Sequence, residues 1–291
     1  MKPAAFEYHA PDTVDEALHL LAKYGDEAKP LAGGQSLIPA MNFRLATPAV
    51  LVDLNAIPEL AGLTSGGGVL RIGGMTRHRV LEHNPDVGRH APLVTTAMPF
   101  IAHAAIRSRG TIGGSLAHAD PAAELPAVML ALDARMTLRR EAATRTVPAA
   151  DFFVGLFATA VEPGELLTEV EIPHAPPRSG FAFDEVSRRH GDFALAGAAA
   201  HVVVDAQGLC TLARVTLLSV ADRPMISAQV AQQLVGHAPT AERIRAAADA
   251  AAAHDIDPTS DIHASSGYRR QLAAVLTRRV LERAFQSVVP T

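Results

Sequence analysis

Two short glycine-containing segments constrain this chain more than any other feature of its sequence. The first covers residues 32–36 and reads AGGQS, and the second covers residues 111–115 and reads TIGGS. Glycine has no Cβ atom, so a glycine pair lets the backbone approach a ligand closely and adopt positive φ, and consecutive N–H groups can then converge on an anion. One glycine pair alone is usually a turn or a bulge. Two pairs, each with a nearby serine that an apolar residue follows, predict two halves of one diphosphate clamp.

The composition narrows the class of protein. A chain of 291 residues is long enough for two or three small domains. Its 26 basic and 30 acidic residues are interspersed and give a net charge of −4, which offers no electrostatic case for binding nucleic acid or an anionic membrane. We therefore expect the polar partner to be a small molecule or another protein.

The number of cysteines and the first residues of the chain indicate the cellular compartment of the protein. Cys210 is the single cysteine, so the chain has no internal disulfide, no cysteine-ligated iron–sulfur cluster and no cysteine-rich zinc site. We expect this cysteine to be a small core residue in an apolar strand. The first eight residues lack an apolar signal core, and no run of about 18 uncharged apolar residues occurs. These features predict a soluble cytoplasmic protein with no metal site of its own.

Periodicity predicts two α/β units before the chain reaches a proline-rich linker. Thr13 and Glu16 form a capping box for a helix that Gly25 ends, and residues 50–54 form a buried strand. A second unit starts near Leu60. Its expected elements are a strand over 69–72, a helix capped by Thr76, a helix over 99–106, a loop at 111–115, a helix over 125–132, and strands at 136–138 and 166–172.

The pattern changes after the prolines at 173, 176 and 177. Strands expected over 181–187, 198–204 and 215–219 are followed by helices over 227–234, 240–253 and 267–285, which predicts a small antiparallel sheet backed by helices. The fold class is therefore α+β, with three units at 1–58, 59–176 and 177–291.

Two carboxylates follow the second glycine segment. Asp120 and Glu124 stand just beyond the expected anion site, where negative charge is unfavourable unless it faces a neutral polyol or a ring N–H. The alternative is that these side chains only cap the next helix, for which an Asp-Pro start is well suited. Both interpretations stay open at this point.

Four stretches of the chain resemble one protein family. They are AGGQSLIP at 32–39, VLVDL at 50–54, IRSRGTIGGSLAHADPAAELP at 106–126 and SRRHGDFA at 187–194. In these stretches, and along essentially the whole chain, the sequence resembles the FAD-binding medium subunit of molybdenum hydroxylases, a family that includes the medium chain of carbon monoxide dehydrogenase and the flavin domain of xanthine dehydrogenase.

The resemblance implies a fold, a cofactor and partners. The fold would be a two-part FAD-binding domain of the PCMH type, over 1–58 and 59–176, followed by the small sheet-and-helix domain over 177–291. The chain would be an oxidoreductase subunit that carries electrons through FAD, in a dimer of heterotrimers with a large molybdenum-cofactor subunit and a small 2Fe–2S subunit. The implied cofactor-binding residues are Ala32, Gly33, Gly34, Gln35, Ser36, Leu37, Thr111, Ile112, Gly113, Gly114, Ser115, Asp120, Glu124 and Phe193.

Two departures from the family pattern bear on the site. Gln35 stands where relatives commonly have histidine, and Phe193 stands where the carbon monoxide enzymes often have tyrosine beside the flavin ring. The pair Arg188 and Arg189 would either favour negative charge on a reduced flavin and steer an acidic acceptor, or form surface ion pairs. His118 is expected to be loop surface, and no residue is assigned a catalytic role.

Two rival functions remain beside the electron-transfer subunit. One is a self-sufficient FAD-dependent oxidase or dehydrogenase that binds its own small organic substrate, which would need a base that the sequence does not offer clearly. The other is an assembly subunit that has lost its flavin, against which the intact glycine pairs argue. No GxGxxG fingerprint or P-loop is present, which disfavours a separate nucleotide site of those kinds.

Overall fold

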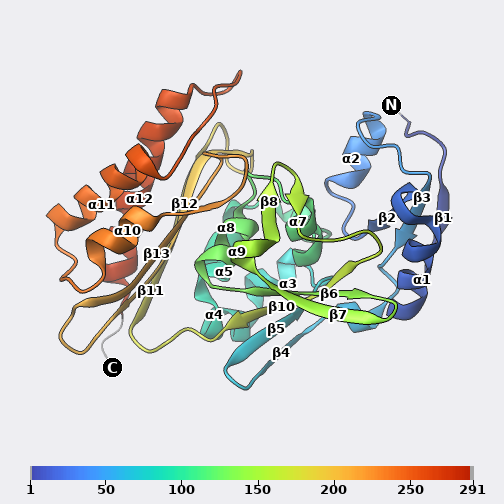
Figure 1. Cartoon of the computed structure of the whole chain (residues 1–291), viewed down its shortest axis with the longest axis horizontal. Helices are drawn as coiled ribbons and strands as arrows, with labels where there is room; N and C mark the ends of the chain where they lie inside the picture. Colours follow the sequence, from blue (N-terminus) through green and yellow to red (C-terminus); the bar gives the residue numbers. More distant parts are fainter. Residues whose placement is uncertain (1, 289–291) are drawn as a thin grey trace.

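The N-terminal part of the chain is a small three-stranded parallel sheet with one long helix. The computed structural model describes residues 2–288, and its sheets and helices follow one another along the long axis of the molecule (Figure 1). The first sheet has the order β1-β3-β2. Its elements are β1 Glu7–His9, α1 Val14–Tyr24, η1 Gly25–Glu27, β2 Ala28–Leu31, α2 Leu37–Asn42, β3 Val50–Asp53 and η2 Pro58–Leu60.

The first helix confirms its predicted signals. The Thr13 side chain accepts a hydrogen bond from the Glu16 amide, and Gly25 ends the helix at φ 53°. The first three residues of β3 are buried, as expected for a central parallel strand. The side chains of Val50 and Val52 pack with the buried side chains of α1 in an apolar core of their own. The loop after β2 therefore projects from a rigid base.

The middle of the chain forms a five-stranded antiparallel sheet packed against short helices. The sheet order is β4-β5-β10-β6-β7, and a two-stranded sheet of β8 and β9 lies beside it. The helices of this part are α3 His78–His83, α4 Pro85–His90, α5 Pro92–Ala97, η3 Met98–Phe100, α6 Ala104–Arg107, α7 Ile112–His118, α8 Glu124–Ala131 and α9 Ala149–Phe152. The strands are β4 Leu63–Gly66, β5 Val69–Gly73, β6 Arg135–Arg140, β7 Ala143–Pro148, β8 Phe153–Gly155, β9 Ala158–Thr159 and β10 Leu166–Pro173.

Three local expectations in this region are wrong. No continuous helix covers 99–106, because η3 ends at Phe100, α6 begins at Ala104, and Ala102 between them has φ 46°. Thr76 does not cap a helix: its hydroxyl donates to the Gly62 carbonyl, and α3 begins after Arg77 without a side-chain cap. Residues 111–115 are not a loop throughout, because α7 already begins at Ile112.

The last part of the chain is an antiparallel sheet with helices on one face. Its elements are β11 Ser179–Ser187, β12 Ala194–Val204, β13 Cys210–Leu218, β14 Met225–Ile226, α10 Ala228–Leu234, α11 Ala241–His254 and α12 Ser266–Gln286, which confirms the predicted arrangement. Figure 1 shows α10–α12 on the outer face and the middle part of the chain on the other. On that inner face the Thr216 hydroxyl donates to the Ala127 carbonyl of α8 at 2.8 Å.

Cys210 is fully buried, and its thiol donates to the Leu212 carbonyl. Burial raises the pKa of this thiol to about 11, so it is a core residue, as expected. Among the described residues no helix is both long and apolar enough to cross a membrane. The observed mixture of helices and largely antiparallel sheets confirms the α+β fold class.

Candidate flavin-binding site

The first glycine segment is a turn that connects β2 to α2. Gly34 has φ +72°, in the left-handed region, and the Gln35 side chain folds back to donate to the Gly33 carbonyl at 3.0 Å. Among the described residues, the hydrogen bonds leave the amides at positions 33–36 without partners. Successive free N–H groups in a turn with a left-handed residue make an anion-binding concavity. This segment is therefore built to receive negative charge.

The second glycine segment is the first turn of α7, and its amides are used internally. Thr111 is the N-cap of this helix, and its hydroxyl accepts from the Gly114 amide at 3.1 Å. The Gly113 amide donates to the Gly74 carbonyl at 2.8 Å, and the Ser115 amide donates to the Thr111 carbonyl at 3.1 Å. A Cβ on Gly113 would lie 2.7 Å from that Gly74 oxygen, so glycine is needed for close backbone packing.

The two glycine segments touch, although they are far apart in the sequence. A Cβ on Gly33 would collide with the backbone oxygen of Arg109 and lie 2.8 Å from the Cα of Gly110. A Cβ on Gly114 would lie 3.5 Å from the Cβ of Ala32. The structure thus brings together the two segments that the sequence singled out. The first segment carries the free amides, and the second forms the start of helix α7.

The other predicted residues of the segments differ in exposure. Ser36 is exposed, and Leu37 and Ser115 are half-buried. Ile112 is fully buried and belongs to the apolar core of the middle sheet, so it anchors the start of α7 to that core. His118, at the end of α7, is exposed, and its ring lies 5.1 Å from that of Phe157.

Asp120 and Glu124 have different local roles. The Asp120 carboxylate accepts from the Ala122 amide at 2.9 Å, which stabilises a turn, whereas the N-cap of α8 is Ala123 without a side-chain cap. The interpretation that Asp120 caps this helix is therefore wrong. Glu124 is the first residue of α8 and only 8 % exposed. Burial, with the negative charge of Asp120, raises the pKa of Glu124 to about 7.

Glu185 is an acidic residue that the sequence interpretation missed. It lies on β11 opposite Gly197 of β12, and one of its carboxyl oxygens is buried without a hydrogen-bond partner among the described residues. Burial, with the charges of Glu124 and Asp184, raises the pKa of Glu185 to about 9. The buried carboxyl group of Glu124 and the partly buried one of Glu185 thus interact electrostatically across the packing of α8 on the last sheet.

The loop between β11 and β12 reaches the approach to the second glycine segment. Gly191 has φ +87°, and a Cβ there would lie 2.6 Å from the His103 ring, just before α6. Phe193 on this loop is 72 % exposed. Arg188 lies 3.3 Å from the His263 ring nitrogen, so part of the predicted basic pair has a local partner.

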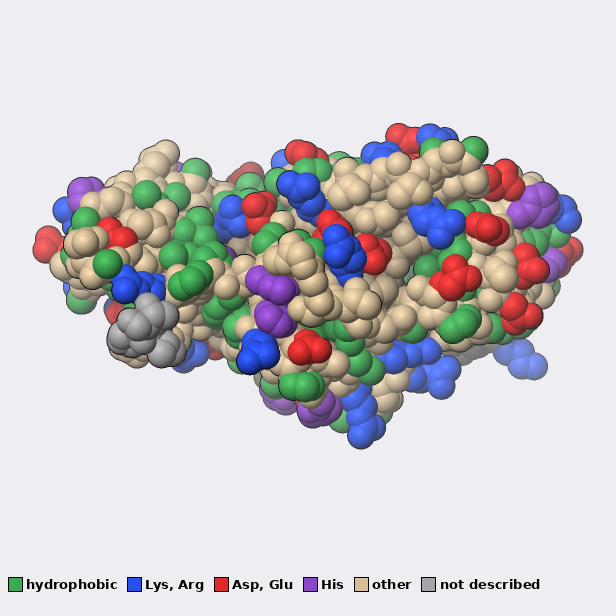
Figure 2. Space-filling view, turned by 90° about the horizontal axis from the view of Figure 1, so that it is seen from below, with side chains coloured by type: hydrophobic (Ala, Val, Ile, Leu, Met, Phe, Trp, Pro, Cys, Tyr) green, Lys and Arg blue, Asp and Glu red, His purple; other side chains and the backbone are tan. Residues whose placement is uncertain are grey.

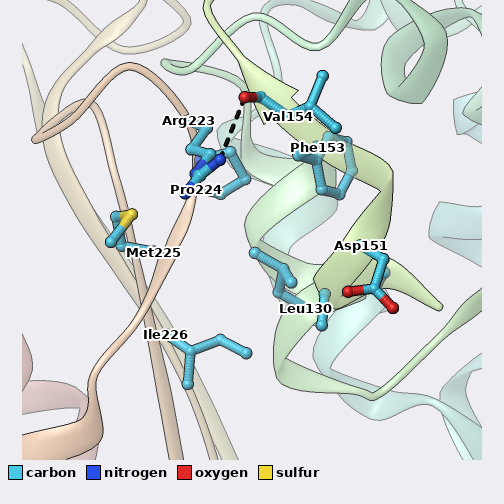
Figure 3. Close-up of a pocket in the computed structure, with 10 residues that line it drawn as sticks. Leu130, Asp151, Phe153, Val154, Arg223, Pro224, Met225 and Ile226 are labelled. Carbon is cyan, nitrogen blue, oxygen red and sulfur yellow. Dashed lines mark hydrogen bonds between the residues drawn. The ribbon is translucent and has the colours of Figure 1, made fainter. Parts of the chain in front are cut away.

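An open hollow of about 420 Å³ lies elsewhere, between β14 and the region of α8, α9 and β8. Figure 3 shows Arg223 at its edge, where the guanidinium donates to the Val154 carbonyl at 3.1 Å. None of its lining residues belongs to a glycine segment. The face in Figure 2 carries acidic and basic side chains interspersed, as the composition predicts.

The residues at the touching segments fit the diphosphate of FAD. Free consecutive amides can bind its oxygens, and the Ser115 hydroxyl has no hydrogen-bond partner within the described chain. Glu124 can accept from a ribityl hydroxyl or a ring N–H when ionised and donate when protonated. Sequence reasoning missed Asn55 and Arg77, whose side chains join the segments. The only available signal was their position, just after the VLVDL strand and the GGMT turn.

Comparison with known proteins gives the same assignment. Residues 4–175 match the model of the FAD binding domain in molybdopterin dehydrogenase, and residues 181–284 match the CO dehydrogenase flavoprotein C-terminal domain. The sequence is 44 % identical to 6-hydroxypseudooxynicotine dehydrogenase complex subunit alpha of Paenarthrobacter nicotinovorans, over 100 % of this chain and 98 % of the relative. It is 40 % identical to the carbon monoxide dehydrogenase medium chain of Afipia carboxidovorans, over 98 % of each.

Solved structures agree along the full length. A chain of carbon monoxide dehydrogenase from Hydrogenophaga pseudoflava has a TM-score of 0.96 at 38 % identity, covering 99 % of this chain and 100 % of that one. A chain of quinoline 2-oxidoreductase from Pseudomonas putida 86 has a TM-score of 0.93 at 40 % identity, covering 99 % of each. The chain therefore belongs to the family of FAD-binding medium subunits of molybdenum hydroxylases, as the sequence resemblance predicts.

Proposed function

We propose that this chain passes electrons from the iron–sulfur clusters of a partner subunit, through FAD bound between its glycine segments, to an acceptor. The observation that carries the proposal is the contact between a segment of free amides and the start of α7, within a chain that matches family members from end to end. FAD supplies the redox chemistry, since it takes up and releases electrons when bound. The protein supplies binding, orientation and electrostatics.

Each part of the site has a proposed task. The free amides of Gly33, Gly34, Gln35 and Ser36 bind the diphosphate, and the Ser115 hydroxyl adds a donor. Thr111, Ile112, Gly113 and Gly114 form the rigid turn on which the first segment rests. Glu124 and Asp120 face the ribityl chain or the ring, and Phe193 covers the ring from its exposed loop. Ala32 and Leu37 flank the turn.

The proposed assembly follows the relatives. Similar proteins include the alpha subunit of a 6-hydroxypseudooxynicotine dehydrogenase complex and a chain of the Cu,Mo-CO dehydrogenase. We propose that this chain likewise joins a large molybdenum-cofactor subunit and a small 2Fe–2S subunit, as a dimer of heterotrimers in the cytoplasm. The three units, at 1–58, 59–176 and 177–291, would share the work: the first two hold the diphosphate, and the third covers the ring side.

The deciding experiment is a visible absorption spectrum of natively purified protein, beside a denaturing gel of what co-purifies. Flavin bands with iron–sulfur features and two further subunits would support the proposal. Flavin bands on a lone chain that bleach with an organic substrate would favour a self-sufficient FAD-dependent enzyme instead. A colourless protein that does not take up added FAD would overturn both.

A further inference from the structure

Asn55 links the first glycine segment to the end of β3. Its side-chain amide donates to the Ala32 carbonyl at 3.0 Å and also to the Asp53 carboxylate. The Asn55 backbone amide donates to the same carboxylate at 2.9 Å. The other oxygen of Asp53 accepts from the Tyr8 hydroxyl of β1 at 2.5 Å. Asn55 is therefore anchored to two strands and holds a carbonyl of the first segment.

Arg77 continues this link to the second glycine segment. One terminal guanidinium nitrogen donates to the side-chain oxygen of Asn55 at 2.5 Å, and the other donates to the Arg109 carbonyl. That carbonyl oxygen is the atom with which a Cβ on Gly33 would collide. Arg77 also forms a backbone bridge with Thr111, the N-cap of α7. A continuous chain of side-chain hydrogen bonds thus joins the Ala32 carbonyl to the Arg109 carbonyl, and the backbone bridge ties Arg77 to Thr111.

The charge of this link suits an anion nearby. Arg77 is half-buried, and burial together with the neighbouring Arg109 guanidinium lowers its pKa, against the opposing effect of Asp53. The guanidinium groups of Arg77 and Arg109 are therefore close enough to repel each other. Like charges repel, and a bound diphosphate would relieve that repulsion.

We propose that Asn55 and Arg77 are positioning residues of the diphosphate site, which hold the carbonyls of Ala32 and Arg109 and so fix the distance between the two glycine segments. The inference rests on the proposed FAD-binding function and adds which residues set its affinity for the diphosphate half. The planar fork of Arg77 serves two acceptors at once, which the single ammonium of lysine does not reproduce in the same geometry.

The test uses the full chain without flavin and compares Arg77→Lys and Asn55→Ala with wild type. The matched control is Arg71→Lys, because Arg71 pairs with Glu169 and Glu171 on the middle sheet and with neither segment. Three ligands are titrated: FAD, ADP, which carries only the diphosphate half, and riboflavin, which carries no phosphate. We expect Arg77→Lys and Asn55→Ala to weaken FAD and ADP about tenfold, which is about 1.4 kcal/mol, and to leave riboflavin unchanged.

Two results of the titrations would overturn the inference. One is unchanged FAD and ADP affinity in both variants. The other is an equal loss for all three ligands together with a large fall in Tm, because that pattern shows general unfolding and not positioning. If Arg77→Lys and Arg77→Gln both lose FAD affinity while both still bind riboflavin normally, the result supports a requirement for the guanidinium fork.

Hydrogen exchange separates this inference from the proposed function. In flavin-free protein the amides of Gly110, Gly113 and Gly114 are hydrogen-bonded. Faster exchange at these amides in Arg77→Lys, but not in Arg71→Lys, would show that Arg77 holds the second segment in place. If wild type also failed to bind FAD, only the proposed function would be overturned. Unchanged exchange at all three amides would overturn the link itself.

Discussion

The two glycine segments look alike in sequence but do different work. In the first, the amides of four successive residues are free and Gly34 has a left-handed backbone; in the second, the amides close the first turn of a helix or bond to Gly74. A glycine pair can therefore expose amides or allow close packing, and the letters do not say which. What distinguishes them is the next element: α2 begins after its glycines, whereas α7 begins before them.

The largest effect is expected where the segments meet. In Gly33→Ala the new methyl group would collide with the Arg109 carbonyl, and backbone cannot yield as a flexible side chain can. We expect FAD affinity to fall at least about 100-fold, or about 2.7 kcal/mol, in a fluorescence titration. Gly88→Ala is the control, because its nearest neighbour would be 4.0 Å away. Near-normal FAD binding in Gly33→Ala would mean that the contact between the segments is irrelevant to the cofactor.

The second prediction compares one glycine from each segment. Gly34→Ala places a Cβ at φ +72°, which costs roughly 1–2 kcal/mol, and disturbs the free amides directly. Gly114→Ala meets the Thr111 hydroxyl at 2.8 Å inside a helix that tolerates alanine. We expect about a tenfold loss of FAD affinity in Gly34→Ala and a smaller loss in Gly114→Ala. The reverse order would reassign the anion site to the second segment.

The carboxyl groups on the side of the second segment predict a dependence of stability on pH, and Glu185 of β11 has the largest effect. The pKa of Glu185 is about 9 in the folded chain, against the ordinary value of 4.5. Between these values the folded chain binds more protons than the unfolded chain, so the stability present below about pH 4.5 is lost as pH rises toward 9. Glu185→Gln removes this loss.

We expect the Tm of Glu185→Gln to exceed that of wild type by roughly 3–5 °C at pH 8 and to match it near pH 4. Thermal unfolding of both proteins across this pH range measures the difference. Asp249→Asn is the control, because Asp249 is an exposed carboxyl of α11 and is not among the charges that raise the pKa of Glu185. Parallel curves for wild type and Glu185→Gln would show that the carboxyl titrates normally.

The smallest expected effect concerns the two hydroxyl residues at the helix starts. Thr111 caps α7 with its hydroxyl, whereas Ser36 precedes α2 without a side-chain cap. Thr111→Ala should therefore cost about 1 kcal/mol of stability in denaturant unfolding, and Ser36→Ala should cost almost nothing. Equal losses in the two variants would remove the structural distinction between the segments.

The sequence was sufficient for features with a local cause. Thr13 and Gly25 mark the two ends of the first helix. The strands of the last sheet were recognisable from their apolar patterns, and the family resemblance identified the cofactor. The helix start at Ile112 was missed because its cap is the same Thr-x-x-Gly that we took for a loop. Ala102 breaks the expected helix over 99–106 without a glycine or a proline at the break.

Features with a distant cause were not accessible. Asn55 and Arg77 act together only because β3 and the turn after β5 meet in space, and neither residue type is distinctive alone. Glu185 became notable only when the fold partly buried it on β11 within the electrostatic reach of Glu124. The contact of Gly33 with Arg109 joins the turn after β2 to the loop before α7, and no local propensity encodes it.

The order of strands in the middle sheet has a consequence for how the chain folds. β4 pairs with β5 and β6 with β7 as neighbours in sequence, but β10 lies between β5 and β6 and is made last. During synthesis two hairpins must wait with unpaired inner edges until Pro173 has emerged, and such edges are prone to pair with other chains. A nascent chain that stalls before Leu166 should therefore be the form most in need of a chaperone.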